Sequence, residues 1–165
     1  MKVVHYTLDS NFKLRPIKIE EGELPIKPKG GIWASPLKAR FGWKHWCDVE
    51  KFGDISSQYP IIMDLDTTNF IVIDRGSDLD KLSWYKIFEV LEAIDFKELV
   101  NQGIDGIYLT RRGEAETRFA FHRNLYGWDC ESVLILNERC ILDYWQKESD
   151  IKLDEIKKLE GENVL

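Results

Sequence analysis

The chain has 165 residues, of which 44% are hydrophobic and 32% charged, and this suits a folded domain with a core of its own. The formal net charge of −6 argues against a general nucleic-acid binder, because such proteins usually carry a basic excess. No run of about 18 apolar residues occurs, so we expect no membrane-spanning helix and no membrane partner.

The cysteines and the first residues indicate a compartment. Three cysteines without a Cys-x-x-Cys spacing favour neither a disulfide framework nor a zinc site. The opening residues, MKVVHYTL, have the pattern of a strand and not that of a signal peptide. We therefore expect a cytoplasmic protein.

The apolar and turn residues predict strands and helices in mixed order. We expect strands at residues 2–8, 31–35, 60–65, 70–74 and 106–110, then a hairpin of residues 130–136 and 139–145 around Asn137 and Glu138. We expect helices at residues 36–52, 77–87 and 95–101, the last one stopping at Gly103. Residues 9–29 and 111–129 lack a clear period and are predicted to be long irregular segments.

Helices inserted in two blocks, without regular βαβ alternation, predict an α+β fold. We expect one domain at residues 1–145 and a charged tail at residues 146–165. In the tail, Ile151, Ile156 and Leu159 are spaced as on a helix, so the tail is predicted to be helical.

The segment at residues 30–47, GGIWASPLKARFGWKHWC, combines three of the six tryptophans with positive charge. Residues 24–47 contain no carboxylate and five cations, namely Lys27, Lys29, Lys38, Arg40 and Lys44. A basic patch on an acidic protein indicates a local anionic ligand. A solvated face for the cations, and a place in the core for the tryptophans, are the alternatives.

Two further residues are candidates for chemistry. His5 lies within the first predicted strand, where a structural histidine is the alternative. Glu131 begins the apolar segment CESVLIL, which is typical of a strand covered on both faces. A carboxylate there is either paired or at a cleft, because burying it alone is costly; a strand-end glutamate in water is the alternative.

In their order along the chain, these segments resemble the ADP-ribosyltransferase superfamily, in its diphtheria-toxin and poly(ADP-ribose)-polymerase branch with a His-Tyr-Glu signature. HYT at residues 5–7 resembles the family's His-Gly-Ser/Thr, and GGIWAS at residues 30–35 resembles its Gly-x-Gly-Ile-Tyr-Phe-Ala strand. HWC at residues 45–47 is similar to Asn-Tyr-Cys, and ESVLILNERCILDYW at residues 131–145 to the run that begins with the signature glutamate. QGIDGIYLT at residues 102–110 resembles a strand common in bacterial and phage members.

The resemblance covers residues 3–145 and implies a split mixed β-sheet with inserted helices. It also implies a mono-ADP-ribosyltransferase that cleaves the nicotinamide–ribose bond of NAD and transfers ADP-ribose to a protein or nucleic-acid acceptor, as a toxin or effector does. The implied catalytic residues are Glu131 and His5. The implied NAD-binding residues are His5, Tyr6, Thr7, Trp33, Ser35, Trp43 and Trp46, with Trp33 and Trp46 at the family's tyrosine positions.

The chain has no Gly-x-Gly-x-x-Gly after a strand, so NAD is expected as a consumed substrate, and no metal is expected. In the family, the loop before the signature glutamate faces the acceptor. Here that loop contains Arg118 and Arg123, which are expected to contact the acceptor, and aromatic residues expected to be exposed, namely Phe119, Phe121, Tyr126 and Trp128. Three alternatives are open: NAD hydrolysis, an inactive interaction module with the same fold, and a small RNA-directed enzyme or binder.

Overall fold

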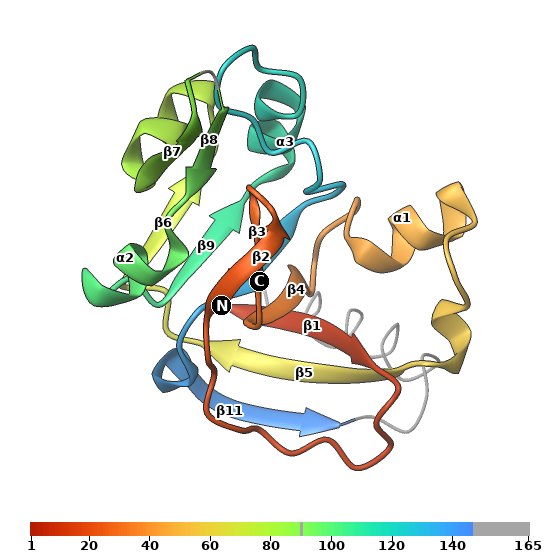
Figure 1. Ribbon diagram of the computed structural model, residues 1–165. Helices are drawn as coiled ribbons and strands as arrows, with labels where there is room; N and C mark the ends of the chain where they lie inside the picture. The colour runs from red at the N-terminus through yellow and green to blue at the C-terminus, as the bar shows by residue number, and fades with distance from the viewer. Residues whose placement is uncertain (90, 147–165) are drawn as a thin grey trace, which may run out of the picture.

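The computed structural model describes residues 1–89 and 91–146, so the predicted helix of the tail lies outside the described residues, beyond Gln146. The described chain is an α+β structure around a seven-stranded mixed sheet (Figure 1). The strand order is β11–β5–β1–β4–β10–β9–β6. The strands are β1 (Lys2–Thr7), β4 (Ile32–Pro36), β5 (Tyr59–Leu65), β6 (Phe70–Ile73), β9 (Gly106–Leu109), β10 (Ser132–Ile135) and β11 (Ile141–Gln146). Among the strands of residues 1–89 and 91–146, only β6 and β9 pair in parallel.

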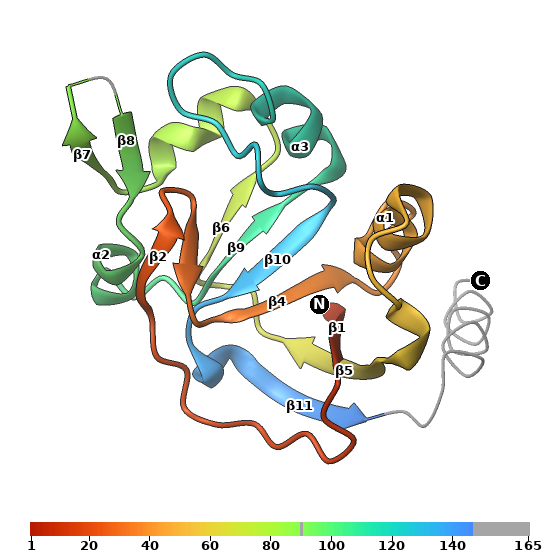
Figure 2. The same ribbon diagram turned by 45° about the vertical axis from the view of Figure 1, so that its right-hand side comes forward.

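The sheet curls at β4, whose two ends pair with different neighbours (Figure 2). The first residues of β4, from Ile32 to Ala34, pair with β10, while Ser35 and Pro36 pair with β1. The last residues of β1, from His5 onward, pair with β5 but not with β4. The sheet therefore opens beside β4, and side chains of β1, β4 and β10 face a shared space there.

Several predicted elements are confirmed. The five single strands lie where they were expected, with ends shifted by at most one residue. The helix α2 (Phe96–Asn101) is capped by Asp95, whose side chain accepts a hydrogen bond from the backbone N–H of Glu98. Gly103 follows it with φ +84°, a left-handed conformation that favours glycine. The helix expected from residue 36 is shorter: α1 spans Trp43–Glu50, after a turn.

The predicted hairpin of residues 130–145 is wrong. β10 is buried along its length, and its two edges are occupied by β4 and β9. β11 therefore pairs with β5 at the far edge of the sheet, after the short helix η3 (Glu138–Cys140). The apolar pattern identified both strands but not their partners.

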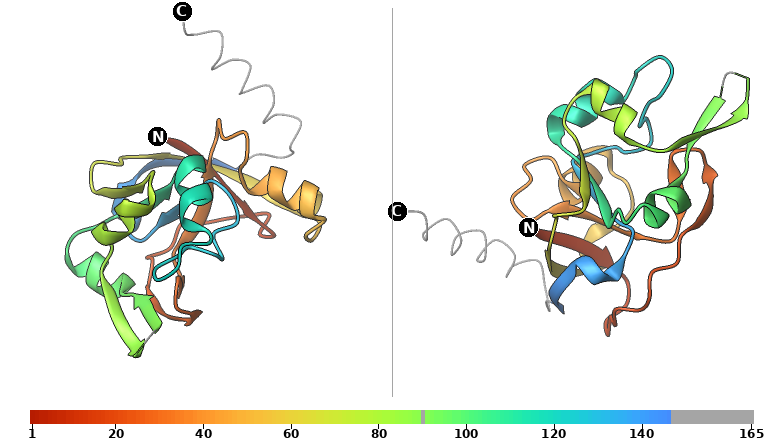
Figure 3. Two further views of the ribbon diagram at one scale, coloured as in Figure 1. Left: turned by 90° about the horizontal axis from the view of Figure 1, so that it is seen from above. Right: turned by 90° about the vertical axis from the view of Figure 1, so that its left-hand side faces the viewer.

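Three other predicted segments are also wrong. The helix expected at residues 77–87 is a short helix, η2 (Gly76–Lys81), followed by a hairpin of β7 (Trp84–Phe88) and β8 (Leu91–Ile94), which stands away from the sheet (Figure 3). The connection at residues 9–29 contains the hairpin β2 (Glu20–Leu24) and β3 (Lys27–Lys29). The segment at residues 111–129 begins with α3 (Arg111–Thr117), because the Thr110 hydroxyl accepts from the N–H of Gly113 and caps the helix.

The core lies on both faces of the sheet. Leu134, Leu99 and Trp128 belong to a buried cluster on one face, and Val133, Ile135 and Met63 to a cluster on the other. A smaller cluster under α1 contains Val4, Tyr6 and Cys47, and a further short helix, η1 (Ile55–Ser57), contributes Ile55 to it. Among the described residues, no helix is both long enough and apolar enough to cross a membrane.

Candidate functional site

A pocket of about 350 Å³ lies where the sheet opens beside β4, and we call it the Trp33 pocket. Its residues come from β1, β3 and β4, from the start of α1, from the residue after the short helix η1, and from the start of β10 with the segment that precedes it. They are Val4, His5, Tyr6, Lys27, Trp33, Ala34, Ser35, Trp43, Gln58, Gly127, Trp128, Asp129, Cys130 and Ser132. Aromatic walls with a few polar groups are typical of small-molecule sites.

The start of α1 is fixed against β4 by a buried serine. The Ser35 hydroxyl, 3% exposed, accepts a hydrogen bond of 2.9 Å from the backbone N–H of Trp43. A Cβ at Gly42 would lie 2.9 Å from the Cβ of Ser35, so glycine permits this close approach. The arrangement holds the Trp43 ring at the edge of the pocket.

Two tryptophans and a cation form another wall. The rings of Trp33 and Trp128 meet edge to face with centroids 4.6 Å apart. Trp128 is fixed because its indole N–H donates to the carbonyl of Ile26 at 2.8 Å. The Lys27 ammonium lies 5.6 Å from the centroid of the Trp33 ring, so this wall carries a positive charge beside an aromatic face.

His5 is oriented by the strand beside it. Its Nδ1 lies 2.8 Å from the carbonyl oxygen of Trp33, which can only accept, so Nδ1 carries a proton. Burial lowers the pKa of His5 below its ordinary value of 6.5, although the hydrogen bond to Trp33 opposes this shift. The neutral ring has a lone pair on Nε2, and this atom accepts hydrogen bonds.

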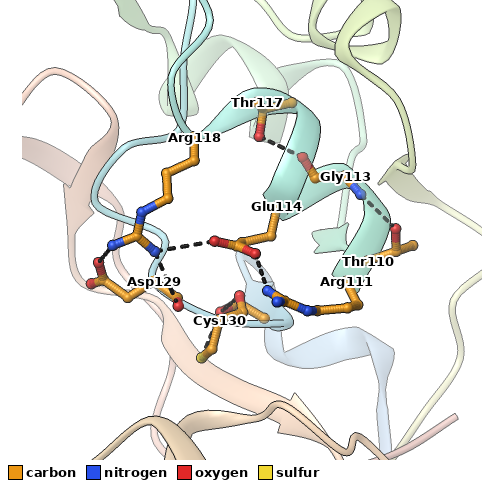
Figure 4. Close-up of polar contacts among 9 residues, drawn as sticks. Thr110, Arg111, Gly113, Glu114, Thr117, Arg118, Asp129 and Cys130 are labelled. Atoms are coloured by element: carbon orange, nitrogen blue, oxygen red, sulfur yellow. Dashed lines mark hydrogen bonds and ion pairs between the residues drawn. The ribbon is translucent and has the colours of Figure 1, made fainter. Parts of the chain in front are cut away.

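The carboxylate of the pocket belongs to Asp129. Its Oδ1 accepts a hydrogen bond of 3.2 Å from Nη2 of Arg118, whose Nη1 also donates to the Asp129 carbonyl at 3.3 Å (Figure 4). Within residues 1–89 and 91–146, Oδ2 of Asp129 accepts no hydrogen bond. The Asp129 carboxylate that lines the pocket is therefore oriented by Arg118 through one of its two oxygens.

Arg118 is held in turn by a buried glutamate on α3. Glu114 is 4% exposed, and its carboxylate lies between the guanidinium groups of Arg118, at 3.1 Å, and Arg111 (Figure 4). A buried carboxylate is costly unless it is paired and hydrogen-bonded, and two arginines meet that requirement. Asp129 is thus anchored to the core through Arg118 and Glu114.

The Cys130 thiol and the Ser132 hydroxyl, which follow Asp129 in the sequence, point toward other groups of the protein. Ser132 Oγ donates to the carbonyl of Cys130 at 2.8 Å. Burial raises the pKa of the Cys130 thiol, so the thiol is protonated at neutral pH and is a poor nucleophile. The pocket favours chemistry that uses a carboxylate over chemistry that uses a thiolate.

Five of the seven residues predicted to bind NAD line this single pocket: His5, Tyr6, Trp33, Ser35 and Trp43. Thr7 and Trp46 are not among its lining residues. Thr7 ends β1, and its hydroxyl accepts from the N–H of Asp9. Trp46 lies behind Trp43, stacked on it with centroids 5.1 Å apart, and also contacts Phe52.

Glu131, the predicted catalytic carboxylate, is also absent from the pocket lining. Its Oε1 accepts a hydrogen bond of 2.6 Å from the Tyr108 hydroxyl, and burial together with this contact raises the pKa of Tyr108. Residues alternate along a strand, and Ser132 faces the pocket, so Glu131 and Val133 point to the other face of the sheet.

The two arginines predicted to face an acceptor both form ion pairs within the protein. Arg118 pairs with Glu114 and Asp129, beside the Trp33 pocket. Arg123 pairs with Asp80 and with Glu92 of β8, near the outer hairpin. Of the loop aromatics, Phe119, Phe121 and Tyr126 are exposed as expected, whereas Trp128, 1% exposed, is buried.

Sequence reasoning did not identify Asp129 or Ser132 as site residues, and it placed Trp128 at the surface. The signal that was available is the sequence GWDCES, in which a tryptophan and an aspartate lie a few residues before a buried strand. Side chains at the end of a strand often contribute to a functional site. This signal was missed because the segment before the strand has no clear period.

Within the described ranges, no group of three or more His, Cys, Asp or Glu side chains is arranged to hold a metal ion. All three cysteines are buried free thiols. Comparisons with models of known protein families, with curated proteins and with solved structures gave no match.

Proposed function

We propose that this protein is an ADP-ribosyltransferase with an ADP-ribosyltransferase-like split sheet, and that NAD binds in the Trp33 pocket. The observation that carries the proposal is the convergence of His5, Tyr6, Trp33, Ser35 and Trp43, from three segments of the chain, on one pocket that also contains a carboxylate. In the sequence, each of these five residues stands at a position that resembles an NAD-binding position of the family.

The aromatic walls suit the nicotinamide end of NAD. The nicotinamide ring of NAD is cationic, and tryptophan is the side chain that attracts a cation most strongly through its ring face. Trp33 and Trp43 border the pocket, so the ring would bind against one or both of them. A volume of about 350 Å³ is within the range for small-molecule sites and admits nicotinamide with its ribose.

Asp129 is the group we assign to the bond-breaking step. When the bond between nicotinamide N1 and ribose C1 breaks, the electron pair goes to nicotinamide, which leaves as a neutral molecule, and positive charge develops on the ribose. A fixed carboxylate stabilises this charge where it appears. An acceptor oxygen or nitrogen then forms the new bond to C1, and its proton passes to Asp129 or to water.

His5 is assigned to substrate binding. Its neutral ring presents Nε2 as an acceptor, which suits a hydroxyl group of the nicotinamide ribose. Because Nδ1 is engaged with the Trp33 carbonyl, the ring is oriented before NAD arrives. Such orientation lowers the entropic cost of binding.

The experiment that tests the proposal uses NAD labelled in the adenylate phosphate. The purified protein is incubated with it, alone and with cell lysate, and the label is followed onto protein, onto nucleic acid or into free ADP-ribose. We expect release of nicotinamide and label in at least one of these products, lost in His5→Ala. No nicotinamide release above a protein-free control would contradict the proposal.

A further inference from the structure

A second pocket, of about 410 Å³, adjoins the Trp33 pocket, and we call it the cation pocket. The two pockets share a wall formed by Val4, Tyr6, Ser35 and Trp43. The rest of the cation pocket comes from the turn after β4 and the first turns of α1. It is lined there by Pro36, Leu37, Lys38, Ala39, Arg40, Gly42, Lys44, His45 and Asp48.

Three of the five cations at residues 24–47 line the cation pocket, namely Lys38, Arg40 and Lys44. Lys29 is paired with Glu20 in the β2–β3 hairpin, and Lys44 lies 3.7 Å from Asp48. Lys38 and Arg40 are exposed, and neither forms an ion pair within residues 1–89 and 91–146. Gathering like charges costs energy through repulsion, and a net charge of −6 offers many carboxylates that could have neutralised them. The arrangement is typical of an anion site.

The backbone at the start of α1 adds to the positive electrostatic potential of the cation pocket. α1 begins at Trp43, and Gly42 to His45, at its N-terminal end, line the pocket. No acidic residue lies in the first turn of α1, so the positive end of the helix dipole is not balanced within that turn. Side-chain cations and a helix start that face one hollow together suit a phosphate group.

Aromatic side chains line the cation pocket together with the cations, namely Tyr6, Trp43 and His45. Trp43 is supported from behind by Trp46, on which it stacks with ring centroids 5.1 Å apart. Aromatic faces interleaved with positive charge are what proteins use to bind single-stranded nucleic acid, since bases stack and phosphates pair with cations. The Trp33 pocket has its own cation for the diphosphate of NAD, Lys27, which leaves the cation pocket for a different phosphate.

We propose that the cation pocket binds a phosphate group of a short single-stranded nucleic acid, and that this strand is the acceptor of ADP-ribose. The role of acceptor rests on the proposed function, whereas binding of the strand does not. Because the pockets share a wall, a strand held in one brings a base or sugar nucleophile to the ribose in the other. The acidic remainder of the protein repels phosphates and restricts the contact to a few nucleotides.

The test measures the binding of fluorescein-labelled 12-nucleotide RNA and DNA strands by fluorescence anisotropy at several salt concentrations. The variant is Lys38→Ala with Arg40→Ala. The matched control, Lys13→Ala with Arg15→Ala, removes one exposed lysine and one exposed arginine from the segment between β1 and β2. We expect the variant to bind about tenfold more weakly than the control, and its slope of log affinity against log salt to fall by about 1.4, as for two lost phosphate contacts on a single strand.

NAD binding, followed by tryptophan quenching in the same proteins, separates this proposal from the proposed function. We expect the Lys38 and Arg40 variant to bind NAD as tightly as the control. Binding of the nucleic-acid strand without binding of NAD would support the phosphate site and contradict the proposed function. Equal strand binding by variant and control, no strand binding at all, or a parallel loss of NAD affinity in the variant would overturn the phosphate site.

Discussion

The guanidinium group of Arg118 joins the Asp129 carboxylate, at 3.2 Å, to the buried carboxylate of Glu114, at 3.1 Å. One of the three groups is in the Trp33 pocket and another is in the core, so the position of the pocket carboxylate depends on the packing of α3. The proposed chemistry needs such fixation, because a carboxylate stabilises developing charge only when it is held near it.

Asp129→Asn is expected to lower the rate of nicotinamide release about 100- to 1,000-fold, the size of effect seen when one preorganised transition-state contact is removed. The substitution keeps the shape and removes the charge. The rate is measured at saturating NAD, and circular dichroism checks the fold.

Glu131→Gln is the matched control for Asp129→Asn. Its carboxylate faces Tyr108 on the opposite side of β10, so we expect little change in the rate. If Glu131→Gln abolishes turnover and Asp129→Asn does not, the sequence-based assignment of Glu131 is correct and our assignment of Asp129 is wrong.

Arg118→Ala and Arg123→Ala are expected to differ, although the sequence suggested the same role for both. Loss of Arg118 releases Asp129, so NAD hydrolysis and ADP-ribose transfer both fall. Loss of Arg123 breaks contacts with Asp80 and Glu92, away from the pocket, so hydrolysis is retained. Both activities are measured on each variant, and hydrolysis equal in the two variants would contradict the proposed positioning of Asp129.

Glu114→Ala is expected to reduce the free energy of unfolding by about 3 kcal/mol, because the change leaves two arginines without their buried partner. Urea denaturation gives the value. The control is Glu116→Ala on the same helix, where an exposed carboxylate pairs with Arg112 and a smaller loss is expected. Equal losses for the two variants would show that burial of Glu114 is not what stabilises α3.

His5 is expected to make both stability and NAD binding depend on pH below neutrality. Its pKa in the folded protein is below 6.5, so the unfolded chain binds its proton more tightly. The stabilising contribution is complete above pH 6.5 and is lost as the pH falls toward the lower folded pKa. Protonation also removes the acceptor at Nε2.

The comparison for His5 is with His5→Gln, which does not titrate. We measure the free energy of unfolding and the affinity for NAD from about pH 5 to about pH 8. The difference between wild type and variant should shrink as the pH falls. A difference that stays constant over this range would show that His5 does not titrate with the predicted sign.

Local patterns in the sequence were sufficient for most strands and for α2, because alternation and caps are encoded within a few residues. They were not sufficient for the partner of β11, since pairing depends on which strand edges remain open after distant strands meet. The segment at residues 111–129 was misread for a related reason. Its Thr110 cap is local, but Arg118 and Arg123 are held by ion pairs with Glu114 and Asp129, and with Asp80 and Glu92, respectively.

The site was predicted in part. His5, Trp33, Ser35 and Trp43 lie on or beside strands whose positions were predictable, and these strands bring them together. Whether Glu131 or Asp129 is the carboxylate of the pocket depends on the side of the sheet to which each side chain points. Both residues precede β10, so the bend of the chain into that strand determines the two directions. Similarly, Trp43 and Trp46 are both on α1, and only the rotation of the helix places Trp43 at the pocket.

The measurement that tests the central claim most directly is a crystal structure of the protein with NAD bound, using Asp129→Asn to slow turnover. We predict the nicotinamide ring against Trp33 or Trp43, the attached ribose within hydrogen-bond distance of His5 Nε2, and residue 129 beside ribose C1. NAD bound away from the Trp33 pocket, or an empty pocket at saturating NAD, would contradict the account.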